Sequence, residues 1–160
     1  VDEIITVEDS ELIVAFLDMV ENHKMIVENS GLLTVAALKH MDVKKKKIVS
    51  ILSGGNMDVI TMASIVQHGL ILRDRVFTVS VLLPDKPGEL ARVSAILAEI
   101  QANVIKLEHN QFVSLNRNAA VELRITMEAF GTEHKREIVE TLNDHGYRPK
   151  LVKGSGTYND

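Results

Sequence analysis

The alternation of hydrophobic and polar residues gives the second half of the chain a clear pattern. Apolar residues occupy every second position from Phe77 to Leu83 and from Val121 to Met127, which is typical of strands with one buried face. Helical spacing predicts one helix over residues 90–100 and another that Thr132 caps and Gly146 closes, and further strands are expected over 104–113 and 147–152. The resulting order, βαββαβ, is the ferredoxin-like split arrangement.

The first half has a different pattern. It predicts a short strand over residues 4–7 and helices over 11–20, 31–41 and 59–68, the last of these ending at Gly69 as its C′ residue. The continuous apolar run Ile48–Leu52 is typical of a buried strand in a parallel sheet. The expected helix N-caps are Asp9-Ser10, Asn56 and Thr132.

These patterns predict an α/β chain with two modules and a tail. Residues 1–74 contain too few strands to complete a covered parallel sheet, so we expect them to be a piece of a larger domain. Residues 75–152 carry a complete ferredoxin-like pattern, and residues 153–160, which are rich in Gly and Ser, form a flexible tail. The first residue is Val rather than Met, which agrees with a segment of a longer chain.

Composition excludes several classes of function. The 160 residues include 18 basic and 22 acidic side chains, and this net charge of -4 provides no concentrated positive field for nucleic acid. No apolar run approaches the roughly 20 residues that span a bilayer. The absence of cysteine excludes disulfides and thiol chemistry, and no histidine pair has metal-ligand spacing. We therefore expect a cytoplasmic protein without a metal, membrane or nucleic-acid partner, in which Lys44–Lys47 is a solvated loop.

Two loops have residues suited to ligand binding. Ser53-Gly54-Gly55-Asn56 follows the predicted strand Ile48–Leu52, at the sheet edge where open α/β folds bind ligands. It lacks the third glycine of a dinucleotide fingerprint and the Gly-Lys-Ser/Thr ending of a phosphate loop, and it also suits a tight structural turn. Glu28 is either an acid at a helix N-terminus or a site carboxylate.

The second loop, Asp85-Lys86-Pro87-Gly88-Glu89-Leu90, joins a strand to a helix. The amides at that helix start can hold a carboxylate with the help of the helix dipole. A turn with Pro near the first helical position requires the same residues without any ligand.

Together these segments resemble threonine ammonia-lyase (threonine dehydratase), a pyridoxal phosphate enzyme of fold type II with a C-terminal ACT domain. Residues 1–7, Val27-Glu28-Asn29-Ser30-Gly31 and the run from Ile48 to Asp58 carry the resemblance in the first module. The resemblance implies that Ser53 lies against the pyridine nitrogen of the cofactor and that Glu28 lies near it. It also implies that Gly54, Gly55 and Asn56 shape the wall of the pocket.

The chain also departs from that family. The lysine that holds the cofactor, which stands in a Ser-x-Lys-x-Arg context, is absent, as is the glycine run around the phosphate, and Asn29 replaces a small residue or Pro. No other side chain substitutes for that lysine amine. This polypeptide alone is therefore expected to bind no pyridoxal phosphate and to be inactive, and an N-terminal catalytic domain would be its missing partner.

In the second module the resemblance implies an ACT domain, which forms homo-oligomers and can bind an amino acid between copies. One copy would provide Asp85, Lys86, Pro87, Gly88, Glu89 and Leu90, and its neighbour would provide Asn103, Val104 and Ile105. Isoleucine, valine, threonine and serine are the candidate effectors.

The resulting hypothesis is a C-terminal regulatory portion of threonine ammonia-lyase. The full-length enzyme would deaminate L-threonine to 2-oxobutanoate and ammonia, a step of isoleucine biosynthesis in amino-acid metabolism. Two alternatives remain open: a non-enzymatic amino-acid-binding or assembly module, and a related serine dehydratase or racemase.

Overall fold

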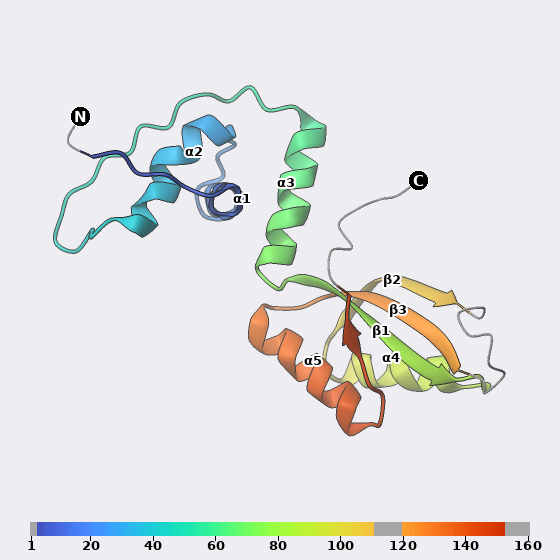
Figure 1. The fold of residues 1–160 in the computed structure, drawn as a ribbon. Helices are drawn as coiled ribbons and strands as arrows, with labels where there is room; N and C mark the ends of the chain where they lie inside the picture. Colours follow the sequence, from blue (N-terminus) through green and yellow to red (C-terminus); the bar gives the residue numbers. More distant parts are fainter. Residues whose placement is uncertain (1–2, 111–119, 153–160) are drawn as a thin grey trace. The chain divides into compact units, whose positions relative to one another are not determined.

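A computed structural model describes residues 3–110 and 120–152 (Figure 1). The chain forms two compact units, Val1–Leu72 and Arg73–Asp160. Each unit has its own apolar core. None of the helices in the described ranges is long and apolar enough to cross a membrane.

The first unit is helical. It contains α1 (Asp9–Asp18), a π-helical turn η1 (Met19–His23), α2 (Asn29–Ala36), a 3-10 turn η2 (Ala37–His40) and α3 (Val59–Leu72). The helices pack around Phe16, Leu32 and Ala36, all of which are almost fully buried. The predicted helices over 11–20, 31–41 and 59–68 are therefore confirmed, although their ends differ.

Three predicted helix ends in the first unit are wrong. The N-cap of α1 is Glu8, whose backbone N–H donates to Glu11 Oε2 at 2.9 Å in a capping box. Asp58 rather than Asn56 precedes α3, and it accepts the Thr61 N–H at 2.9 Å. Gly69 does not end α3, because the helix continues to Leu72. A Cβ at Gly69 would lie 2.5 Å from Leu17 Cδ1, so this glycine lets α3 approach α1 closely.

The predicted strands of the first unit are also wrong. Among residues 3–72 none is in a strand, and the segments 4–7 and 48–52 have no regular secondary structure. Val49 and Ile51 were expected in a buried strand but are 89% and 75% exposed. A strand is stabilised by its neighbours, and this unit provides none for either segment.

The second unit contains β1 (Val76–Pro84), α4 (Glu89–Glu99), β2 (Asn103–Asn110), β3 (Ala120–Glu128), α5 (Thr132–Asp144) and β4 (Lys150–Leu151). The sheet order is β2-β3-β1-β4, and every pairing is antiparallel. The predicted ferredoxin-like order is confirmed. Residues 111–113 of the predicted second strand and the tail 153–160 lie outside the described residues.

The core of the second unit lies between the helices and one face of the sheet. The alternate residues Val79 and Val81 of β1 and Leu123 and Ile125 of β3 are fully buried there, together with residues of α4 and α5. The predicted cap Thr132 is instead the first helical residue of α5, after the N-cap Gly131. β4 is an edge strand next to β1.

Candidate functional site

The structure brings the Ser53-Gly54 loop against the N-terminus of α2. The Glu28 N–H donates to the Gly54 carbonyl oxygen at 3.4 Å, and Thr34 Oγ1 donates to the Ile51 carbonyl oxygen at 3.3 Å. A Cβ at Gly31 would lie 1.9 Å from the Ser53 carbonyl oxygen. Because that atom belongs to the backbone, only glycine at position 31 permits this approach.

Glu28 is the residue around which this site is built. It is the N-cap of α2, and its carbonyl oxygen accepts the Gly31 and Leu32 N–H groups at 2.9 and 3.2 Å. Its half-buried carboxylate accepts a hydrogen bond of 2.5 Å from Ser30 Oγ. A Cβ on Gly54 would lie 2.2 Å from Glu28 Oε1, and the φ of Gly54 is +83°. Glu28 is thus an acid at a helix N-terminus that also lies against the glycine loop.

The remaining loop residues are open to solvent. Ser53, Gly55 and Asn56 are exposed, and no heavy atom lies within 4 Å of a Cβ built on Gly55. Ser53 and the two glycines therefore leave this side of the loop accessible to a ligand. The sequence has neither a lysine in a Ser-x-Lys-x-Arg context nor a run of glycines that could cradle a phosphate. Among the described residues, no cluster of acidic or histidine side chains could hold a metal ion.

The second candidate loop forms a tight turn before α4. Asp85, Lys86, Pro87 and Gly88 are exposed, and the Lys86 N–H donates to the Pro84 carbonyl oxygen at 2.8 Å. Gly88 is the N-cap of α4 with φ +91°, and a Cβ there would meet open space. The left-handed backbone angle favours glycine at this position, and the start of α4 stays accessible.

Glu89 is already engaged in the fold. Tyr147 Oη donates to Glu89 Oε2 at 3.1 Å, and Arg92 Nη1 lies 3.7 Å from Glu89 Oε1. Burial, followed by the Glu89 carboxylate, raises the pKa of Tyr147. These contacts fix the first turn of α4 against the chain that leads into β4.

The loop and the start of β2 lie at opposite ends of the sheet within one copy. Pro84, just before the loop, pairs with Ala120 of β3, whereas Asn103 of β2 pairs with Glu128 at the other end of β3. Eight steps along β3 correspond to about 26 Å at ~3.3 Å per residue. A single site made of both segments therefore requires two copies of the chain.

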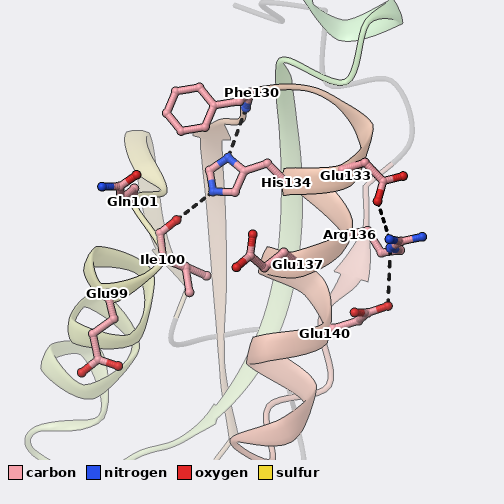
Figure 2. A pocket seen from close by; sticks show the side chains of 9 residues that line it. All are labelled: Glu99, Ile100, Gln101, Phe130, Glu133, His134, Arg136, Glu137 and Glu140. Carbon is pink, nitrogen blue, oxygen red and sulfur yellow. Dashed lines mark hydrogen bonds and ion pairs between the residues drawn. The ribbon is translucent and has the colours of Figure 1, made fainter.

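Two further features of the second unit were missed from the sequence. A groove of about 620 Å³ lies between the end of α4 and α5 (Figure 2). Its lining residues are Glu99, Ile100, Gln101, Phe130, Glu133, His134, Arg136, Glu137 and Glu140.

The second feature is Asp74, which accepts hydrogen bonds from Lys135 Nζ at 2.6 Å and Thr132 Oγ1 at 2.9 Å. Chiefly because of Lys135, the pKa of Asp74 is lowered.

His134 connects the two helices at the groove. Its Nδ1 accepts the Phe130 N–H at 3.1 Å, and its Nε2 is 2.7 Å from the Ile100 carbonyl oxygen. The Phe130 and His134 rings stack with centroids 4.8 Å apart. Since Nδ1 accepts and Nε2 donates, this arrangement requires the neutral Nε2–H tautomer. Only the three-dimensional packing of the two helices reveals the groove.

Fold and site define the class of protein as an α/β chain with a ferredoxin-like unit and a glycine loop beside a helix N-terminus. Comparison with curated proteins then indicates the particular relatives. The chain is 35% identical over 155 residues to an L-threonine ammonia-lyase of Geobacter sulfurreducens, covering 96% of this chain and 39% of that protein. It is 33% identical over 153 residues to an L-threonine ammonia-lyase of Thermotoga maritima, covering 95% and 38%.

The chain is also similar to threonine dehydratases, at lower sequence identity. The biosynthetic L-threonine dehydratase of Escherichia coli is 25% identical over 150 residues, 91% of this chain and 28% of that protein. The resemblance to threonine ammonia-lyase is thereby confirmed. The chain spans about two-fifths of the length of the first two relatives.

The other comparisons add no argument. No family model matches the chain. A solved structure of an unknown protein from Galdieria sulphuraria covers 91% of this chain and 92% of its own, at 14% identity and a TM-score of 0.38. A C-terminal domain of an ABC transporter ATP-binding protein from Enterococcus faecalis covers 56% of this chain and 98% of its own, at 18% identity and a TM-score of 0.34. Neither TM-score supports an inference.

Proposed function

We propose that this chain works as part of a threonine ammonia-lyase. Its first unit would belong to the pyridoxal phosphate catalytic domain, and its second unit would be a regulatory ACT domain. The observation that carries this proposal is the similarity of 95–96% of the chain to two L-threonine ammonia-lyases. The complete enzyme would convert L-threonine to 2-oxobutanoate and ammonia in the pathway to isoleucine.

The first unit would provide one wall of the catalytic site. Pyridoxal phosphate, when bound, supplies an electron sink for elimination of the hydroxyl group. The Ser53 hydroxyl would meet the pyridine nitrogen, and Gly54, Gly55 and Asn56 would line the wall. Ser30 holds the Glu28 carboxylate through a hydrogen bond of 2.5 Å, so that this charge stays at the glycine loop. The resident lysine would come from the missing catalytic portion.

The second unit would bind an amino acid between two copies. Amides at the start of α4 around Gly88 would receive the carboxylate, with the helix dipole favouring it. Leu90 and Ile105, which are 40% and 53% exposed, offer apolar surface for the effector side chain. The separation of about 26 Å between loop and strand start along one sheet favours a site shared between copies. Coupling of such a site to the catalytic domain is typically worth about 1–3 kcal/mol.

The effector site is tested by titration calorimetry of the chain with isoleucine, valine, threonine and serine. We expect heat with at least one of them, and no heat in the variant Gly88→Asp, whose carboxylate would repel the ligand carboxylate. Gly88→Asn is the matched control, because Asn and Asp tolerate a left-handed backbone similarly but differ in charge. Binding should persist in the Asn variant.

The results separate the proposed functions. Absence of heat with all four amino acids in a stably associated chain would favour an assembly module. Equal affinity of the Asp and Asn variants for the effector would exclude this loop from the site.

A further inference from the structure

The groove between α4 and α5 contains acidic groups without a cationic partner. Arg136 pairs with Glu133 and with Glu140, and Figure 2 shows these three side chains on the side of α5 that faces away from α4. Glu99 and Glu137 are exposed, and no ion pair joins either of them to another described residue. Glu99 and Glu137 are thus the two carboxylates of the groove lining whose negative charge is not offset by a described side chain.

An aromatic ring stands beside these carboxylates. Phe130 is 80% exposed although one of its faces stacks on His134. Both nitrogens of His134 are engaged by backbone groups, so the imidazole holds the stack in place. A lysine side chain matches this surface, because its methylene stem packs on an apolar ring while its ammonium group meets carboxylates.

Such lysines are present in this chain at Lys44–Lys47. All four are exposed, and no ion pair joins them to another residue of the described ranges. The backbone turns within the run, where Lys45 has φ +60° and the Lys46 N–H donates to the Val43 carbonyl oxygen at 3.2 Å. Four positive charges are thus presented on one tight loop, opposite in sign to the groove.

We propose that the Lys44–Lys47 loop of one copy docks into the α4–α5 groove of a second copy. In a twofold-symmetric pair each copy would donate one loop and accept one, so the contact would form twice. Exposed charge pairs are individually weak and are screened by salt, so this contact is reversible and depends on ionic strength. It uses neither the Gly88 loop nor β2.

Zero-length cross-linking of mixed isotopic copies tests the contact directly. Equal amounts of ¹⁴N- and ¹⁵N-labelled chain are treated with a carbodiimide, which joins amines to carboxylates without a spacer. We expect linked peptides between Lys44–Lys47 and Glu99 or Glu137, with partners from differently labelled copies in about half of them, as random pairing requires. In 1 M salt the yield should fall at least about fivefold, because the Debye length shrinks to ~3 Å. Links found only within one copy, or none to this loop, would overturn the proposal.

Sedimentation of matched variants provides the second measurement. Neutralising Glu99→Gln and Glu137→Gln together should weaken self-association about tenfold, whereas Glu133→Gln with Glu140→Gln should stay within about twofold. Reversing all four lysines to Glu should weaken association, and adding Glu99→Lys with Glu137→Lys should restore it. Failure of this restoration contradicts the docking. Gly88 variants should leave the cross-links unchanged, so this result and that of the effector site are independent.

Discussion

The two units differ in whether their apolar segments find a neighbouring strand with which to pair. In the second unit, β1 lies between β3 and β4, and its inward residues are buried under α4 and α5. In the first unit, the apolar run 48–52 has no strand partner, and Val49 and Ile51 are mostly exposed. The comparison teaches that an apolar pattern becomes a strand only where a neighbouring strand is available.

The largest expected effect is on the core of the second unit. Leu123→Ala removes a fully buried side chain in β3 and should lower the free energy of unfolding by about 3 kcal/mol. Urea unfolding followed by circular dichroism measures this change. Leu82→Ala in the adjacent strand is the control, because Leu82 is 58% exposed and its removal should cost far less. Equal losses would contradict the assigned sheet faces.

The next effect concerns the close packing of α3 on α1. Alanine normally stabilises a helix relative to glycine, but a Cβ on Gly69 would lie 2.5 Å from Leu17 Cδ1. Gly69→Ala should therefore destabilise the first unit by about 1–3 kcal/mol. Thermal unfolding followed by amide exchange in α1 measures this, with Gln67→Ala on the exposed side of α3 as control. A stabilised Gly69→Ala variant would refute the close approach.

A smaller, pH-dependent effect is expected at the start of β1. The pKa of Asp74 is lowered mainly by Lys135, so its ionised form is favoured in the folded state. The resulting stability is present above the unfolded pKa, ~3.9, and is lost as the pH falls through the folded value. Asp74→Asn should lower the free energy of unfolding by about 1 kcal/mol at pH 7. The difference should vanish at a pH low enough to protonate the Asp74 carboxyl in both the folded and the unfolded chain. Urea unfolding of the parent chain and of Asp74→Asn, at pH 7 and at pH 3, measures how their difference in stability changes with pH. A difference that is the same at both pH values would exclude the ion pair.

The smallest effect is expected where the sequence pattern and the structure disagree. Val49→Ser should change the stability of the chain by less than about 0.5 kcal/mol, because Val49 is 89% exposed. The same substitution at the fully buried Val79 is the comparison. A large loss at Val49 in chemical unfolding would mean that the 48–52 segment pairs as a strand after all.

The sequence predicted the second unit well because its pairing partners are all local to it. Alternation identified β1 and β3, which are neighbours in the sheet. The first unit was predicted only in its helices. The errors in helix ends have a local cause. The residues at 9, 10, 56 and 132 are acceptable caps by type, but the helices start after Glu8, Asp58 and Gly131 instead.

The candidate sites were predictable in part. The glycine loop and Glu28 were singled out from residue types, and the structure places them in contact. Two facts depend on tertiary structure and had no signal in the sequence: Glu89 is bound by Tyr147, and Phe130 stays exposed on His134. The α4–α5 groove was missed for the same reason.

Complementation between two defective copies tests the central claim, a site shared by two chains, most directly. Gly88→Asp removes the loop half and Ile105→Asp removes the strand half, so neither variant alone should bind the effector found by calorimetry. In an equal mixture, heteropairs regain one intact site of two, and binding capacity should return to about a quarter of the parent value. Sedimentation first verifies that both variants still associate. A mixture that binds no more effector than its components would contradict the shared site.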